Sequence, residues 1–374
     1  NSAGAVNTLA GQFGYEGHLG VYGTKRWRRT SIGLDYNGAY RGYTKNTYYN
    51  GADNFLGIEF GDQIDRKSLL NATVTAGTSS RVFGAVNGLV GVPLGNILPT
   101  SDIFDGRTYF INGGMGISHQ LTERFGFELR ADGFRVERHS TALISVEGYS
   151  PKASLSYRLN KRDTVGTIYN FIHYDYPRAF GEADIHVAMG YWTHLLNPTW
   201  KFEVQGGTFI ANSTGTQTIA ADPVVQQLLG VSTITEAFAR TVILPNGQVS
   251  LSGRTGNSSV TLSAYRGAGA GNGLTLATSE QSGSVSYNYV FSKHFNGGVH
   301  GTYSSSVALT SSADRYSILF TGFDMQYRPN TSLIYSFRGE YRKATVTSNT
   351  NYAGNAFQVG LGIGWNIKDF PFTH

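Results

Sequence analysis

Large apolar side chains recur at every second position along most of this chain. The clearest case lies between Phe357 and Trp365, where the odd positions hold Phe, Val, Leu, Ile and Trp and the even positions hold Gln and three Gly. A period of two places such a stripe on one face of a β-strand. A strand of a soluble sandwich would carry charge on its opposite face, and this segment carries none there.

The same alternation predicts about 17 strands of about 10 residues each, the length and period of strands that cross a membrane. The other clear stripes begin at Ile32, Leu56, Leu70, Ile111, Phe125, Ala153, Ile185, Trp200, Val260, Val285, Phe295 and Leu333. Lipid can then be the apolar partner of each stripe, so that no second sheet is needed.

The links between these strands alternate in length. Short polar links such as 61–68 and 118–124 are followed by longer ones such as 78–107 and 267–279. Short turns at one end and long loops at the other are typical of a transmembrane barrel. The sequence therefore predicts an all-β, antiparallel up-and-down barrel of about 16–18 strands, with residues 1–374 in one domain.

Composition supports this fold class and removes some others. Glycine accounts for 48 of 374 residues, and cysteine is absent, which excludes a disulfide framework and thiolate metal sites. No apolar run approaches the roughly 18 residues of a membrane-spanning helix. An aromatic content of 13% argues against disorder.

Charged side chains alternate with the apolar stripes on several strands, and we expect them to face the lumen. By this reasoning the pore-lining residues are Glu128, Arg130, Asp132, Lys201, Glu203, Arg338, Glu340 and Arg342. The same alternation predicts that the stripe from Ile185 to Tyr191 faces outward. It also predicts that His186, Trp192 and His194 face inward.

Aromatic residues near strand ends, such as Tyr157 and Trp200, suit the girdles found at membrane interfaces. Together with the phrases HQLTERFGFELRADG (119–133) and YRLNKRDTVGTIYNF (157–171) and the aromatic last strand, they make the chain resemble the outer-membrane β-barrel proteins of Gram-negative bacteria. The resemblance covers nearly the whole chain. It implies short periplasmic turns, long extracellular loops, location in the cell outer membrane, and lipid and lipopolysaccharide as partners.

Other candidate chemistry is weak. The run GAGAGNG (267–273) joins two predicted strands and opens no helix, which favours a loop hinge over a phosphate-binding loop. The nine histidines show no paired ligand spacing. Asp175, Glu182 and Asp184 around the link 176–184 could hold Ca²⁺, although a solvated acidic loop is the favoured interpretation. We expect neither an enzyme nor a cofactor.

The formal net charge of +5 does not indicate nucleic-acid binding, because the basic residues are scattered over many turns. Such residues suit contact with anionic headgroups.

Residues 211–247 form the longest predicted link, a partly helical loop. Asp222 is a candidate N-cap, Pro223 the first helical residue and Gly230 the residue just past the helix. An ordered long loop has either of two expected roles, a constriction folded into the pore or a surface that packs against a partner. We favour the constriction.

A porin-like channel for small polar solutes is the favoured function, because a barrel of this size encloses water. One alternative is a barrel that exports exopolysaccharide or another polymer. Such a barrel needs aromatic platforms on its inner face, whereas most large aromatic residues here are expected to face outward. Trp192 and Tyr265 are expected to face inward. The other is a plugged structural barrel that holds a partner protein.

The strand count raises one more expectation. The first and the last predicted segments both run toward the periplasm, whereas single-chain bacterial barrels have an even number of strands. We therefore expect an eighteenth strand between them, supplied by a segment upstream of residue 1 or by another protein chain.

Overall fold

The computed structural model describes residues 13–44, 50–79, 107–140, 143–220, 226–227, 230, 232–271, 273, 275–309, 315–346 and 354–365. Seventeen strands run through these residues: β1 (Gly14–Arg26), β2 (Thr30–Tyr43), β3 (Gly51–Asp62), β4 (Ser68–Ser79), β5 (Thr108–Gln120), β6 (Phe125–Arg138), β7 (Val146–Arg158), β8 (Asp163–Tyr176), β9 (Gly181–Asn197), β10 (Trp200–Ala220), β11 (Thr233–Thr255), β12 (Ser258–Gly269), β13 (Thr278–Val290), β14 (Phe295–Ala308), β15 (Arg315–Tyr327), β16 (Leu333–Val346) and β17 (Gly354–Trp365).

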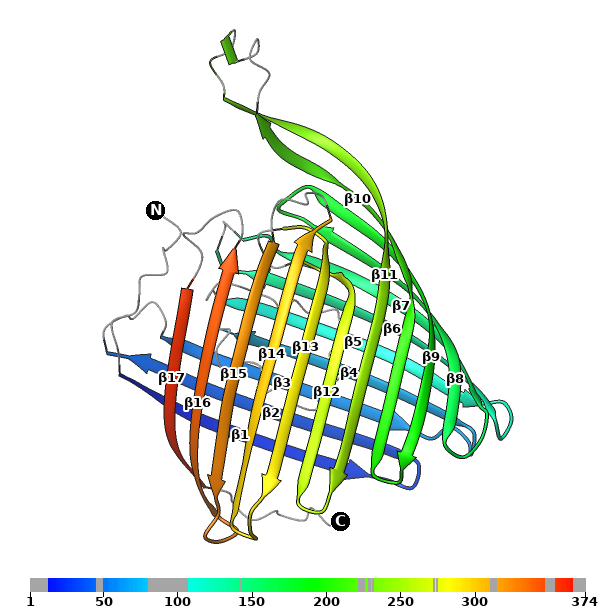
Figure 1. Cartoon of the computed structure of the whole chain (residues 1–374), viewed down its shortest axis with the longest axis vertical. Coiled ribbons are helices and arrows are strands. Elements are labelled where there is room, and N and C mark those ends of the chain that lie inside the picture. Colours follow the sequence, from blue (N-terminus) through cyan, green and yellow to red (C-terminus); the bar gives the residue numbers. More distant parts are fainter. Residues whose placement is uncertain are drawn as a thin grey trace.

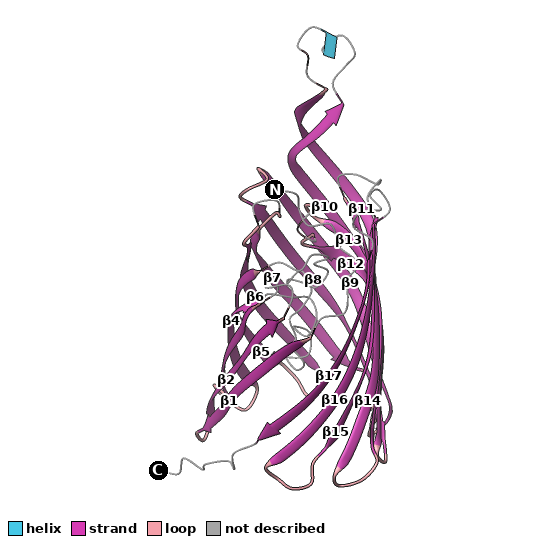
Figure 2. Ribbon diagram, turned by 90° about the vertical axis from the view of Figure 1, so that its left-hand side faces the viewer, coloured by secondary structure: helices cyan, strands magenta, loops and turns pink. Residues whose placement is uncertain are grey.

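Each strand pairs antiparallel with the next one along the chain, from β1–β2 through to β16–β17. The sheet curls into a wall around an interior (Figures 1 and 2). This confirms the predicted all-β, up-and-down barrel architecture and the count of 17 strands. Among the described residues no ladder joins β1 to β17, and the expected eighteenth strand stays a prediction.

The outer face of the wall is apolar because the alternating stripes point away from the interior. Leu361, Ile363 and Trp365 on β17 are 84%, 76% and 77% exposed, and Leu129 on β6 is 49% exposed. Burial of such side chains normally drives folding in water, so a continuous exposed belt of them indicates an apolar surrounding. No described helix is long and apolar enough to cross a membrane.

The largest group of buried apolar side chains lies on the concave face, at the end of the wall that carries the longer links. We call it the inner apolar cluster: Phe134, Val136, Val146, Ile172, Tyr174, Tyr176, Ala183, Ile185, Val187, Phe209, Ala211, Ala268, Ala270, Leu276, Ala277 and Leu309. Its members come from β6 to β10, from the end of β12, and from the links that follow β12 and β14. Side chains from strands so far apart can meet only on the inside of the curve.

The inner apolar cluster corrects the assignment of faces on β9. Ile185 and Val187 pair with Ala211 and Phe209 of β10, and both are buried on the inner face. Their stripe was expected to face outward, and this expectation is wrong. His186, Trp192 and His194 consequently face outward. Alternation shows which residues share a face of a strand, but it does not show which face points inward. On this strand both faces carry apolar groups, so polarity does not decide between them.

The prediction of a loop over 211–247 is also wrong for most of its length. Strand β10 continues to Ala220 and β11 begins at Thr233, so that the two form a long ribbon which projects beyond the other strands (Figure 1). Threonine at alternate positions 214, 216 and 218 favours a strand, because its β-branched side chain suits the pleated backbone.

Gly230, predicted to follow the short helix, has the conformation of a helix cap. Gly230 has a φ of 65°, and its N–H donates to the carbonyl of Gln226 at 2.9 Å, as in a left-handed helix cap. Within the described part of this link, Gln226 and Gln227 are helical. Asp222 and Pro223 lie outside the described residues.

The link after β8 is shorter than predicted. β8 ends at Tyr176 and β9 begins at Gly181, so most of 176–184 is strand. Asp184 faces outward, and its Oδ1 lies 2.7 Å from Nδ1 of His173. Asp175 pairs with Glu182 across the same two strands. Among the described residues no cluster of three or more His, Asp or Glu side chains is arranged to hold a metal ion.

Candidate functional site

The predicted pore-lining residues of β6 lie on the inner face. The Arg130 guanidinium contacts Asp132 at 2.7 to 2.9 Å, and its Nη2 is 3.4 Å from Oγ1 of Thr73 on β4. Residues two apart on a strand share a face, which explains why Arg130 and Asp132 meet. Glu128 lies two positions nearer the short turn, on the same face. This part of the wall is polar but locally neutralised.

The second predicted group, on β10, forms a similar pair. Nζ of Lys201 lies 2.7 Å from Oε2 of Glu203, and Nε2 of Gln205 donates to the other carboxylate oxygen at 2.7 Å. The Lys201 side chain is half exposed. The pair therefore lies at a polar surface on the inner face, near the short-turn end of the wall.

The third predicted group, on β16, also lies on the inner face, but it is more deeply buried. Glu340 is 3% exposed and Arg342 is 8% exposed. The side chain of Arg338 extends beyond β16, and its Nη2 contacts Oε2 of Glu16 on β1 at 3.0 Å. The eight predicted residues thus share the inner face but form three separate groups around the wall.

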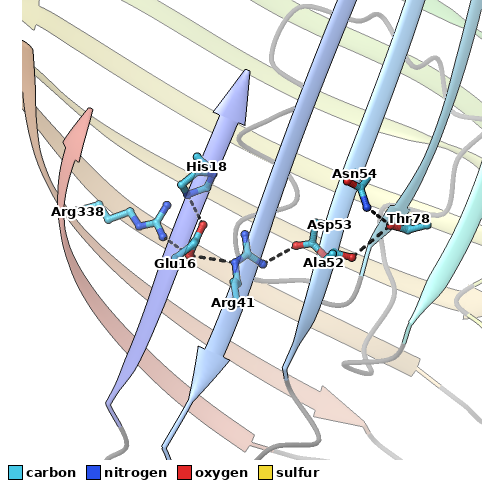
Figure 3. Close-up of polar contacts among 8 residues, drawn as sticks. All are labelled: Glu16, His18, Arg41, Ala52, Asp53, Asn54, Thr78 and Arg338. Carbon is cyan, nitrogen blue, oxygen red and sulfur yellow. Dashed lines mark hydrogen bonds and ion pairs between the residues drawn. The ribbon is translucent and has the colours of Figure 1, made fainter. Parts of the chain in front are cut away.

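Glu16 is the centre of a charged network that sequence reasoning missed (Figure 3). Arg41 Nε lies 3.0 Å from Oε2 of Glu16, and Arg41 Nη1 lies 2.7 Å from Oδ2 of Asp53. Figure 3 also shows His18 pointing at Glu16, and Arg338 approaching it from β16. We call Glu16, Arg41, Asp53 and Arg338 the seam network. Arg41 could have been found in the sequence, because it follows the outward stripe of β2 by one position.

The inner face of β17 carries glycine where the side chain of Arg338 crosses the strand toward Glu16. Arg338 is paired with Gly360, and a Cβ on Gly360 would lie only 3.1 Å from Nε of Arg338. Gly362 is likewise overlaid by Ser336, whose Oγ would be 2.5 Å from an added Cβ. Side chains of β16 thus cross β17 where it has none of its own. Gly360 and Gly362 therefore leave room on the inner face for the side chains of β16.

The link between β12 and β13 folds into the interior. The Tyr176 hydroxyl donates to the carbonyl of Ala270 at 3.2 Å, and Ile144 N–H donates to the carbonyl of Gly273 at 2.7 Å. Leu276 belongs to the inner apolar cluster. We call the described residues 270, 271, 273 and 275–277 the inner loop. It covers part of the inner face of β8 to β10 and narrows the interior there.

Glycine is required at two positions of the inner loop. Gly271 and Gly273 have φ values of 83° and 87°, which disfavour any side chain. A Cβ on Gly273 would lie 2.8 Å from Nε of Arg138, a residue that is 1% exposed and whose Nη1 contacts the carbonyl of Ile144. The run GAGAGNG thus joins two strands, as predicted, and its residues Ala270 and Gly273 lie inside the wall.

The constriction predicted for 211–247 is therefore not formed by the ribbon residues that the structure describes, which project outward. The inner loop occupies the interior instead. Sequence reasoning identified GAGAGNG as a link, but the buried position of that link depends on Arg138 and Tyr176, which lie more than 90 residues earlier.

Comparison with known proteins gives limited information. No protein-family model matches the chain, and no curated protein matches it. Among solved structures, the ferric yersiniabactin uptake receptor FyuA from Yersinia pestis is 10% identical, covers 92% of this chain and 63% of its own, and has a TM-score of 0.41. The FrpB iron transporter from Neisseria meningitidis in its apoprotein form is 10% identical, with coverages of 96% and 67% and a TM-score of 0.47.

A third similar structure is the open form of the ferric-catecholate import receptor Fiu from Escherichia coli K12, at 9% identity, coverages of 95% and 73% and a TM-score of 0.46. This chain spans 63% of the length of the yersiniabactin receptor. Similarity at this level concerns the course of the strands and carries no argument about what passes through the wall.

Proposed function

We propose that this chain is a β-barrel of the Gram-negative outer membrane which passes small polar solutes through its interior. The observation that carries the proposal is the opposite polarity of the two faces. Leu361 and Ile363 represent a broadly exposed apolar exterior, whereas Arg130, Glu203 and Arg338 lie on the inner face. A bilayer favours this arrangement, because the apolar side chains of the exterior contact lipid chains and the polar groups of the interior stay in water.

The paired charges suit a channel of weak ion preference. Arg130 is neutralised by Asp132, Lys201 by Glu203, and Arg338 by Glu16. Each pair leaves a local dipole but little net field along the pore, so small neutral and charged solutes meet similar electrostatic barriers. The inner loop narrows the path on the side of β8 to β10, which limits the size of the solute.

Export of a polymer is less well supported. An export barrel needs aromatic platforms along its inner face. Of the two aromatic residues expected there, Tyr265 is on the inner face, whereas Trp192 faces outward and donates to Asp163 at 2.9 Å. The proposal includes no catalytic step and no cofactor. Outer-membrane lipid and lipopolysaccharide surround the apolar exterior.

Conductance in a planar lipid bilayer tests the proposal. Refolded protein whose fold is verified by its β-rich circular dichroism and by heat-dependent gel mobility should give discrete current steps in KCl. Folded protein that inserts into the bilayer and gives no current would overturn the channel function. Vesicle swelling in a neutral solute provides a second measurement that does not depend on ion flow.

A further inference from the structure

The ribbon formed by β10 and β11 leaves one backbone edge of β11 without a neighbouring strand. β10 pairs with β11 from Gly253 to Thr233. On the other side of β11, the ladder with β12 covers only Gly247–Thr255. Within the described part of the chain, no ladder joins residues 233–246 to a strand on that side. We call this stretch the ribbon edge. Such an edge presents N–H and C=O groups with which another strand can pair.

The sequence of the ribbon edge is nearly symmetric about Phe238. The nine residues from Ile234 to Val242 read ITEAFARTV. On each side of Phe238 come an alanine, a charged residue, a threonine and a β-branched apolar residue, in that order. The two charged residues, Glu236 and Arg240, have opposite signs. A strand with this sequence is complementary to a second copy of itself that runs in the opposite direction.

We propose that the ribbon edge is an interface between two copies of this chain, which pair antiparallel through β11 about a two-fold axis at Phe238. In this register Glu236 of each copy lies opposite Arg240 of the partner subunit. The other opposite pairs are Ala237–Ala239, Thr235–Thr241 and Ile234–Val242. Opposite-charge pairs and threonine pairs both stabilise antiparallel sheets. Such an interface is self-complementary, because the same surface is used on both copies.

Charge selects this register over its neighbours. The two-fold axis must pass through a residue, because an axis between two residues would bring opposite faces of the strand together. Moving the axis by one residue, to Ala237 or Ala239, places each charged side chain opposite an apolar one. Moving it by two, to Glu236 or Arg240, places two like charges opposite each other, which is destabilising. The register centred on Phe238 is therefore the favoured one.

The ribbon edge is accessible to a second copy. The ribbon projects beyond the other strands, at the end of the wall that carries the longer links (Figures 1 and 2). Of the nine residues from Ile234 to Val242, all are exposed except Phe238 and Val242, which are half-buried. Phe238 packs over Gly215 of β10, so its ring does not block the edge.

The course of the ribbon also suits two copies in one membrane. Such copies are related by an axis along the membrane normal, so strands that pair antiparallel must run across that axis. Figure 1 shows the distal part of the ribbon bending sideways, across the direction of β13 and β14. The bend therefore brings the ribbon edge toward the orientation that the pairing requires.

The mass of the protein in detergent micelles, measured by light scattering, tests the interface. The unaltered chain should form a concentration-dependent dimer. Glu236→Arg and Arg240→Glu each turn both ion pairs into like-charge contacts, and each should raise the dimer dissociation constant by about tenfold or more. The double variant Glu236→Arg/Arg240→Glu restores opposite charges and should dimerise as the unaltered chain does. Heat-dependent gel mobility verifies the fold of each variant.

A mixture of the two single variants gives the sharpest readout. Glu236→Arg has two positive charges at the ribbon edge and Arg240→Glu has two negative ones, so the variants should pair with each other although neither pairs with itself. Arg254→Glu is the matched control, because it reverses an exposed charge at the short-turn end of β11 and should leave the dimer unchanged.

An unaltered chain that stays monomeric would overturn the interface. Single variants that dimerise as well as the double variant would overturn it too. None of these measurements depends on ion flow, so they leave the proposed channel function untouched.

Discussion

Nη2 of Arg338 on β16 lies 3.0 Å from Oε2 of Glu16 on β1, so an ion pair links the last part of the sheet to its first strand. The Arg338 side chain reaches Glu16 across β17, over Gly360. The seam network thus joins β16 to β1, β2 and β3 on the inner face, although no ladder among the described residues joins β1 to β17.

Substitution of either partner should destabilise the protein. Glu16→Gln and Arg338→Gln each leave a partly buried charge with fewer partners. A double-mutant cycle should give a coupling free energy of about 0.5–3 kcal/mol for the pair. Denaturant-induced unfolding in detergent or lipid vesicles measures it. Strictly additive effects of the two substitutions would show that the contact contributes nothing to stability.

Gly360→Val should reproduce the loss of the Arg338 contact. An added Cβ would lie 3.1 Å from Nε of Arg338, and the further methyl groups of valine should push the guanidinium away from Glu16. The effect of Gly360→Val should be small in a protein that already carries Arg338→Gln. Gly364→Val is the control, because an added Cβ there would be 3.7 Å from Ile334, an ordinary contact.

Neutralising the inner-wall arginines should make the channel prefer cations. Replacing Arg130, Arg338 and Arg342 with glutamine removes three positive charges from the inner wall. Asp132 then loses the ion pair with Arg130, and Glu16 loses Arg338 while it keeps Arg41. We expect the K⁺ to Cl⁻ permeability ratio to rise by about 2–10-fold, because counter-ions concentrate in a channel of one sign. Reversal potentials in a KCl gradient measure the ratio.

The same three-charge change can be made away from the inner wall. Arg66, Arg124 and Arg162 are exposed residues of short turns, and their replacement by glutamine should change the reversal potential far less. Equal shifts in the two triple variants would place Arg130, Arg338 and Arg342 outside the conduction path.

Displacing the inner loop should enlarge the pore. Gly273→Val forces a side chain into a backbone with a φ of 87° and against Arg138, which costs about 1–3 kcal/mol in strain. The loop can relieve this strain by leaving the inner wall. Single-channel conductance should then increase, and larger solutes should enter vesicles.

Gly256→Val is the matched control for backbone strain. Gly256 has a φ of 54°, but an added Cβ would meet nothing within 4 Å, and the residue lies in a short turn. It should lose stability without gaining conductance. Were Gly273→Val to conduct as the unaltered protein does, the inner loop would not limit the pore.

The turn between β3 and β4 should show a simple pH dependence. Asp65 accepts hydrogen bonds from the Lys67 N–H at 2.6 Å and from the Ser68 N–H and hydroxyl at 2.7 and 3.0 Å. These bonds, the Lys67 N–H first among them, lower the pKa of Asp65 below its ordinary value. The carboxylate therefore stabilises the folded state above the unfolded pKa of about 3.9, and this contribution is lost as pH falls through the lower folded pKa.

Asp65→Asn should remove that dependence. The unaltered protein should unfold at a higher denaturant concentration than Asp65→Asn at pH 7, and the two midpoints should converge toward pH 2. Midpoints whose difference stays constant across this range would show that the charged form of Asp65 has no stabilising role.

The sequence by itself determined the strands of the wall. A period of two, strands of nearly uniform length and links of alternating length are local properties, and they predicted the fold class, the strand count and the inner position of residues such as Arg130 and Arg338. Gly230 was predicted correctly as a helix cap for the same reason, because the left-handed conformation depends on that residue alone. On strands with only one apolar face, the sequence also showed which face points outward.

Tertiary structure alone decided which face of β9 points inward, because Ile185 and Val187 are buried in the inner apolar cluster and do not face lipid. It also decided that the inner loop folds into the interior, that 211–220 extend a strand, and that Arg338 meets Glu16, 322 positions away in sequence. Each of these depends on partners brought together by the curl of the sheet. A local pattern carries no information about that curl, since burial is set by what lies opposite a side chain and not by its neighbours in the chain.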